Sequence, residues 1–137
     1  MSIENRGIRR LIEGCLTEYS SASNSAQALL DASWVTLYES TDLANATMLL
    51  GHTITISGGT PVAPSMRISA RKNSFNTYFK IYPSGTNLSI TSEADAMYSQ
   101  PLVIPKGWSY KIEGYCTTAN SANAALTDLL IIKLHEG

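Results

Sequence analysis

From residue 34 onward, apolar and polar side chains mostly alternate in short runs, with the period of two typical of half-buried β-strands. The clearest run is MRISAR at 66–71, in which every second side chain is apolar. Further runs of strand character lie at 34–40, 53–57, 77–82, 87–91, 100–104 and 109–117. Residues 129–134, LLIIKL, are almost continuously apolar, which predicts a central strand covered on both faces.

Turns containing Gly or Pro separate these runs, as at Gly58-Gly59, at Pro83-Ser84-Gly85 and at PKGW, residues 105–108. The small residues of 118–125 predict a loop, and so does SEADA at 92–96. Many short strands with regular turn signals predict a mainly β fold. We expect an antiparallel β-sandwich, jelly-roll-like, with about eight strands.

The first nineteen residues follow a helical spacing instead. Their apolar positions fall near the i, i+3, i+4 spacing of one helix face: Ile3, Ile8, Leu11, Ile12, Cys15, Leu16 and Tyr19. The SSASNS stretch that follows, at 20–25, is typical of a linker. The sequence therefore predicts an N-terminal helical arm and Ser/Asn linker over residues 1–25, and a β-sandwich domain over 26–137.

The predicted arm needs a surface to pack against, because an isolated helix of this length is marginally stable. One interpretation is that it packs on its own domain. The other is that Ile8, Leu11, Ile12 and Leu16 bind a neighbouring subunit, as amphipathic helices do in grooves.

Four aromatic residues are candidates for a subunit interface, since Trp and Tyr are enriched there: Trp34, Tyr38, Trp108 and Tyr110. The competing interpretation is that they belong to the core. Another group combines cations with aromatic residues on outward-facing positions: Arg67, Arg71, Lys72 and Lys80 with Phe75, Tyr78 and Tyr82. Such a group could bind single-stranded nucleic acid or a sugar, or it could be an ordinary solvated sheet face.

Composition narrows these alternatives. Charged residues make up only 15% of the chain and the net charge is −1, so no global field favours nucleic acid or an anionic membrane. No apolar run approaches the ~18 residues of a membrane span, and no secretory signal is recognisable, so we expect synthesis in the cytoplasm. In that compartment Cys15 and Cys116 are expected to be reduced, although a disulfide between them stays open.

Catalytic motifs are absent from the sequence. His52 and His135 lack partners at metal-ligand spacing, and no Gly-x-Ser-x-Gly or phosphate-binding loop occurs. Glu93 and Asp95 are too few for a typical calcium loop. We therefore expect no enzymatic activity, no cofactor and no metal; a hydrolase or isomerase on a cupin-like barrel is the weakest alternative.

Residues 33–134 resemble small β-sandwich structural proteins of tailed-bacteriophage virions, of the head-decoration, fibre and tail-accessory type. The resemblance lies in SWVTLYES, HTITISGG, NTYFKIYPSGTNLSI, PLVIPKGWSYKIEGY and LTDLLIIKL. Similar patterns occur in secreted trimeric jelly rolls of the tumour-necrosis-factor and complement type. The resemblance implies a place in a virion and contacts with other virion proteins, but no site residues.

These observations lead to two hypotheses. The first is a virion structural protein, made in the host cytoplasm, that forms a homo-oligomer and attaches to a capsid, neck or tail surface. A trimer is the first guess by analogy. The second is a carbohydrate- or receptor-binding module, with exposed aromatic side chains near the polar residues 73–76 or 92–98.

Overall fold

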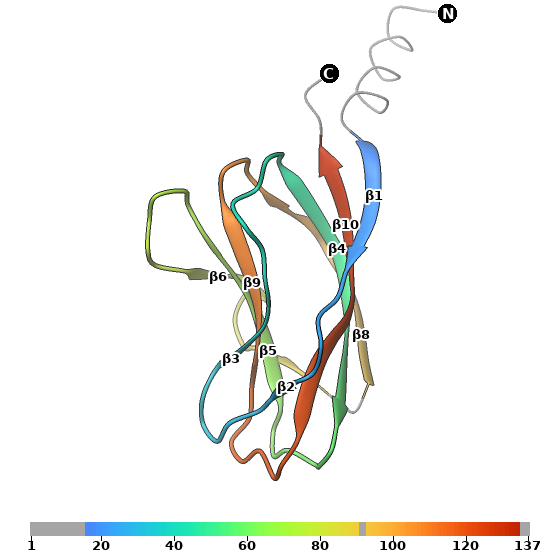
Figure 1. Cartoon of the computed structure of the whole chain (residues 1–137), viewed down its shortest axis with the longest axis vertical. Helices are drawn as coiled ribbons and strands as arrows, with labels where there is room; N and C mark the ends of the chain where they lie inside the picture. The colour runs from blue at the N-terminus through green and yellow to red at the C-terminus, as the bar shows by residue number, and fades with distance from the viewer. Residues whose placement is uncertain (1–15, 91–92, 135–137) are drawn as a thin grey trace, which may run out of the picture.

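A computed structural model describes residues 16–90 and 93–134, and it contains ten β-strands there (Figure 1). The strands are β1 Leu16–Ala22, β2 Gln27–Ala28, β3 Val35–Glu39, β4 Thr47–Ser57, β5 Ser65–Arg71, β6 Phe79–Tyr82, β7 Leu88–Ser89, β8 Glu93–Ile104, β9 Ser109–Tyr115 and β10 Asn123–Leu134. Within these residues there is no helix, and thus none long and apolar enough to cross a membrane. The mainly β prediction is confirmed.

The strands form two antiparallel sheets that face one another (Figure 1). One has the order β1-β10-β4-β8, and the short β2 continues the edge beside β10. The other has the order β3-β9-β5-β6, and β7 pairs with β5. The pairs nest along the chain, β5 with β6 innermost, then β4 with β8, β3 with β9 and β1 with β10. This nesting is the strand order of a jelly roll.

The core lies between the two sheets and follows the alternation of the sequence. In β5, Met66, Ile68 and Ala70 point inward and are almost completely buried, as the MRISAR pattern predicts. The other members of the buried cluster come from both sheets and include Leu37, Leu49, Ile54, Ile112, Leu126 and Leu129. Apolar side chains from two facing sheets thus supply the main stabilising burial.

The apolar run at 129–134 belongs to β10, which lies between β1 and β4 as predicted for a central strand. Leu129 and Ile131 are buried in the core. Leu130 and Ile132 point to the opposite face, where they are only half-buried. In the described residues the strand is therefore fully covered on one face only.

The prediction of helix and linker is wrong for residues 16–22. This segment is β1, an edge strand whose pairing with β10 runs from Leu16 opposite Leu134 to Ala22 opposite Leu129. The long β10 offers a row of backbone donors and acceptors, and pairing with them outweighs a weak local preference for helix. Leu16 consequently lies in a strand, whereas the rest of the predicted arm, residues 1–15, is outside the described residues.

Three strands begin earlier than the alternation predicts. Strand β4 starts at Thr47 and carries His52 inside the sheet rather than in a loop. Strand β8 starts at Glu93, within the predicted SEADA loop, and β10 starts at Asn123, within the predicted loop of small residues. Cross-strand pairing places the first residues of β8 and β10 in the sheet, although their small and polar side chains alone favour loops.

Two leucines test the position of the core. Leu37 is completely buried, so Leu37→Ala should lower the free energy of unfolding by about 2–5 kcal/mol through lost burial and a residual cavity. Leu30 is 57% exposed, and Leu30→Ala is the matched control, expected to cost less than about 0.5 kcal/mol. Urea unfolding followed by circular dichroism measures both; equal losses would contradict the assigned core.

Candidate functional site

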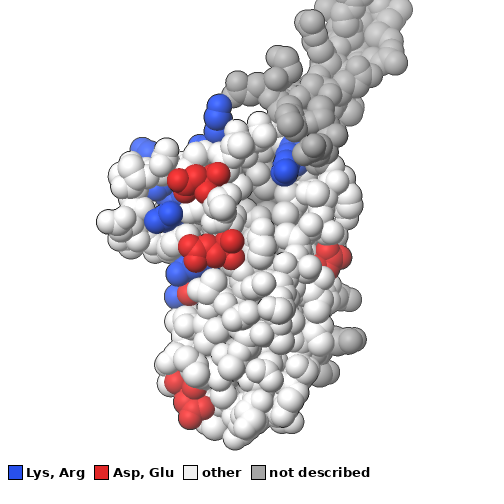
Figure 2. Space-filling view, in the orientation of Figure 1, with Lys and Arg blue, Asp and Glu red and all other residues white. Residues whose placement is uncertain are grey.

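The outer surfaces of the two sheets differ in chemistry. The first, here called the polar face, is the outward side of β3-β9-β5 with the segment around Tyr78. Figure 2 shows that Lys, Arg, Asp and Glu gather on the side of this sheet, whereas the opposite side is mostly free of charge in that view. These two faces and a pocket at one end of the sandwich are the candidate sites.

Glu113 is the centre of the polar face. It points outward from β9, yet its side chain is only 5% exposed because neighbouring side chains cover it. Arg67 Nε donates to its Oε1 at 2.9 Å, Lys111 Nζ lies 3.5 Å from its Oε2, and Ser69 Oγ donates to Oε1 at 3.3 Å. The strand register sets these contacts, since Arg67 is directly opposite Glu113.

Aromatic rings cover the cations of this cluster. The Arg67 guanidinium lies 4.0 Å from the centre of the Trp34 ring, which in turn contacts Tyr115 at 5.1 Å between centroids. On the other side, Lys111 Nζ lies 4.3 Å from the centre of the Tyr78 ring. Each cation therefore has both a carboxylate and a π-system as partners.

Tyr78 extends the network to the end of the sheet. Its hydroxyl donates to Glu39 Oε2 at 2.9 Å and lies 3.2 Å from Ser109 Oγ. Burial raises the pKa of Tyr78 above its ordinary value, and Glu39 adds to the rise. Arg71 donates to Ser109 Oγ at 2.9 Å and lies 3.7 Å from Asp42.

The structure thus divides the four cations that the sequence grouped together. Arg67 and Arg71 are on the polar face, where carboxylates of the same chain already neutralise them. Lys80 is opposite Ser69 on the edge strand β6 and donates to the carbonyl of Gly85, and Lys72 lies 5.5 Å from the centre of the Phe75 ring. This arrangement leaves little unpaired positive charge for phosphate groups on the polar face.

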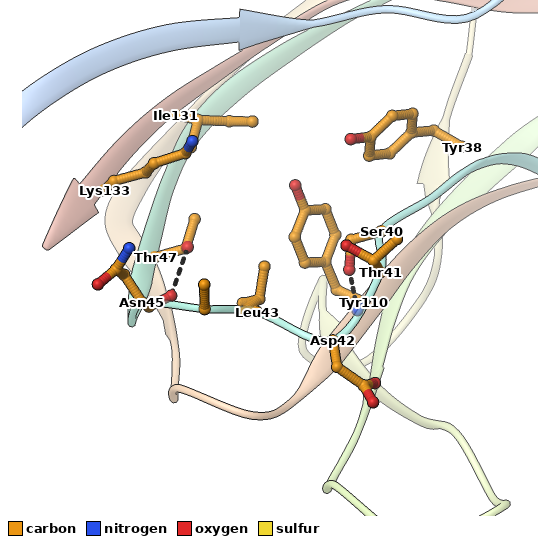
Figure 3. Close-up of a pocket in the computed structure, with 11 residues that line it drawn as sticks. Tyr38, Ser40, Thr41, Asp42, Leu43, Asn45, Thr47, Tyr110, Ile131 and Lys133 are labelled. Carbon is orange, nitrogen blue, oxygen red and sulfur yellow. Dashed lines mark hydrogen bonds between the residues drawn. The ribbon is translucent and has the colours of Figure 1, made fainter.

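A pocket of about 290 Å³ opens at one end of the sandwich, between the sheets (Figure 3). Figure 3 shows the hydroxyls of Tyr38 and Tyr110 pointing into it from one side, with Ile131 and Lys133 on the other. Burial raises the pKa of Tyr110 well above its ordinary value, with a further contribution from Tyr38, so this hydroxyl stays protonated. Asp42 and Lys133 also line the pocket, so it offers hydroxyl groups, apolar side chains and one charge of each sign.

The outer side of the other sheet, here called the apolar face, carries a row of uncharged side chains. The register aligns Tyr19 of β1 with Ile132 of β10, Ile132 with Met48 of β4, and Met48 with Val103 of β8. Tyr19 is 65% exposed and Val103 60%, while Ile132 and Met48 are half-buried. One apolar side chain per strand therefore crosses the whole sheet.

A second line on this face contains a hollow. Leu130 is opposite Gly51, and Gly51 is opposite Met97, which is 69% exposed. A depression of about 240 Å³ lies beside this line, between Leu130 and Met97, with Thr53 and Asp128 in its lining. A Cβ at Gly51 would lie 2.5 Å from the carbonyl oxygen of Ala96, so no larger residue fits there without a shift.

His52 lies in the core and not at a loop mouth. It is 3% exposed, and its Nδ1 is 2.8 Å from the Tyr98 hydroxyl. Burial raises the pKa of Tyr98, with Tyr82 adding to the rise. The pair extends to Tyr82, whose ring centroid lies 4.4 Å from that of Tyr98. His52 therefore has the surroundings of a packed core residue.

The four predicted interface aromatics divide between surface and core. Tyr110 is 2% exposed, so its assignment to an outward surface is wrong: the strand alternation turns it into the core. Tyr38 turns toward the same interior and contacts Tyr110 at 6.0 Å. Trp34 and Trp108 are half-buried; Trp34 lies on the polar face and Trp108 packs edge-on against Phe79.

Several other predicted positions cannot be placed. Ile8, Leu11, Ile12 and His135 are outside the described residues, and the side chains of Glu93 and Asp95 are not described. Within the described part of the chain, no group of three His, Cys, Asp or Glu residues could hold a metal ion. Cys116 is a buried free thiol whose Sγ lies 3.4 Å from the carbonyl oxygen of Leu30, and burial raises its pKa.

Comparison with known proteins gives only a distant likeness. No family model and no curated protein matches the chain. A structure of infectious bursal disease virus, Gx strain, is 14% identical, with 90% of this chain and 32% of that chain covered and a TM-score of 0.46. The crystal structure of an infectious bursal disease virus VP2 subviral particle is 13% identical, with 88% and 30% covered and a TM-score of 0.45. The chain spans about a third of their length, and a likeness of this size says nothing of function.

The Glu113 cluster makes a testable contribution to stability. Glu113→Gln keeps the shape but removes the charge that Arg67 and Lys111 share, and it should lower the free energy of unfolding by about 1–3 kcal/mol. Glu39→Gln, at an exposed position, is the control and should cost less than about 0.5 kcal/mol. Guanidinium would screen the pair, so urea unfolding is the measurement; an unchanged Glu113→Gln midpoint would refute the role of the carboxylate.

Proposed function

We propose that this chain is a non-enzymatic virion structural protein, which associates with copies of itself and attaches to a capsid, neck or tail surface. The observation that carries the assembly role is the apolar face, with its row from Tyr19 to Val103. The place in a virion rests on the sequence resemblance to tailed-bacteriophage structural proteins.

Exposed apolar side chains in this number favour association. Burying a side chain of the size of Tyr, Met or Val yields roughly 1–2 kcal/mol when it starts out mostly exposed. Tyr19, Met97 and Val103 are all at least 60% exposed and lie on the same face. Together they provide a driving force for covering this surface that isolated apolar residues elsewhere do not.

The absence of catalysis is also a proposal, and it rests on the engagement of the reactive groups. Glu113 is held by Arg67 and Lys111. His52 is packed in the core against Tyr98. Groups that are fixed in this way serve packing and stability, because a general acid or base must reach a substrate.

The principal measurement for the proposed function is the solution mass of the full chain. A protein built for assembly should give a defined multiple of 14.8 kDa by light scattering, stable across a wide concentration range. The same samples at high salt should keep their mass, because apolar contacts do not weaken as ion pairs do. A monomer at every concentration would contradict self-association.

A carbohydrate- or receptor-binding module is the second candidate, and one observation favours it. Phe75 is 58% exposed in the polar segment 73–76, where the second hypothesis places an exposed aromatic residue. Phe79 is 48% exposed, and its ring packs edge-on against that of Trp108, with 5.7 Å between the ring centroids. Aromatic rings beside Asn side chains are a suitable surface for a sugar ring.

This alternative predicts binding on a glycan array that Phe75→Ala abolishes. Val62→Ala is the control, since Val62 is 48% exposed and lies in a different loop. The physical reason is that a stacked ring supplies most of the contact area of a small sugar site. An array without signal for the correctly folded wild-type protein would remove this candidate.

A further inference from the structure

The apolar face is unusual because its uncharged side chains form connected rows and not scattered points. Adjacent strands lie ~4.8 Å apart, so the four side chains from Tyr19 to Val103 span the width of the sheet without interruption. Leu130 and Met97 lie further along the strands β10 and β8 and flank the hollow on this face. A second apolar surface of complementary shape can pack against these rows and fill the hollow beside them.

The chemistry of the rows is compatible with an identical partner. Their side chains carry no charge, so two copies can approach without repulsion or the cost of desolvating an ion. Asp128, on the wall of the hollow, is the one charged residue among the described side chains that line it. The polar face offers the opposite case: its charges are already paired within the chain, as at Arg67 and Glu113.

The size of the face also fits a dimer. Strands of 11 and 12 residues, as in β4 and β8, are about 36–40 Å long, and four strands are about 19 Å wide. The whole outer side of the sheet, which includes Thr53 and Thr55 beside the apolar rows, therefore presents roughly 700 Å² in projection. That is close to the about 800 Å² that each partner contributes to a stable interface of ordinary size, with an apolar part and a polar part. Two sheets stacked about 10 Å apart would repeat the packing that forms the core of each subunit.

We propose that the apolar face is the site at which a second copy of this chain docks, sheet against sheet, in a two-fold symmetric dimer. The proposal rests on the self-association proposed above and adds its surface and symmetry. A two-fold contact is isologous, so the same rows of both copies are buried together. The hollow between Leu130 and Met97 then receives a protruding side chain of the second copy.

The test places charges on the face without disturbing the core. Met97 and Val103 are 69% and 60% exposed, so the double variant Met97→Lys, Val103→Lys should fold while its dissociation constant rises at least about 100-fold. The matched control is Val62→Lys, Phe75→Lys, which changes two exposed apolar residues that lie off this face and should keep the wild-type mass. Circular dichroism establishes folding, and light scattering over concentration gives the masses.

Mixing two oppositely charged variants tests whether the partner is a second copy of this chain. The double variant Met97→Glu, Val103→Glu should be monomeric alone, like its Lys counterpart. An equimolar mixture of the two at about 10 mM salt should return to twice 14.8 kDa, because the facing charges are then opposite, and 1 M salt should dissolve it again.

Several outcomes would overturn the inference. They are a wild-type mass of three copies, a Lys double variant that keeps the wild-type mass, and a mixture that stays monomeric. In each of these cases the wild-type chain still self-associates, so the proposed function stands. A wild-type chain that is monomeric throughout removes both.

Discussion

The pairing of β10 with β4 is the interaction on which the rest of the structure depends. It joins Asn123 to Ser57 at one end and Lys133 to Thr47 at the other, across more than half of the chain. The strands β1 and β8 can only attach to the outer edges of this pair, and the second sheet closes over its inner face. Most contacts are therefore between residues distant in sequence, which implies comparatively slow folding.

That central pair also determines why the two outer faces differ. Strand β10 is apolar on both sides, with Leu129 and Ile131 in the core and Leu130 and Ile132 on the outer face. Strands β5 and β9 instead alternate strictly, so that Arg67 and Glu113 meet on the outside while Ile68 and others fill the inside. One sheet thus completes its polar interactions within the chain, and the other has apolar area that residues 16–90 and 93–134 leave uncovered.

The sequence predicts those strands whose pattern of apolar and polar residues or turn residues is visible within the segment itself. The period of two in residues 66–71 identifies β5 and its buried side chains, and the turn residues separate most other strands correctly. Strand β1 could not be predicted, because residues 16–22 become a strand only through the open edge of β10. The same holds for the first residues of β8 and β10, whose small and polar side chains favour loops when considered alone.

The candidate sites show the same division. The sequence grouped Arg67 with Lys72 and Lys80 as possible ligands for phosphate, but it could not show that Glu113 is opposite Arg67. It also left open whether Tyr110 belongs to an interface or to the core, because inward and outward positions are exchanged by a shift of one residue. A local signal for the apolar face did exist: LLIIKL is apolar at consecutive positions, and a strand of that kind needs two apolar surroundings.

The interior of the sandwich provides apolar surroundings for only one side of β10. Leu130, Ile132 and their neighbours Met48 and Val103 carry the remainder to the surface of one sheet. A solvated sheet needs polar residues on its outer side, as the β3-β9-β5 sheet has, so selection for stability alone gives no reason to keep this row apolar. A row of apolar side chains in register across four strands is therefore best explained by a second surface that covers it. For that reason we assign function in this protein to a face, and not to a cleft.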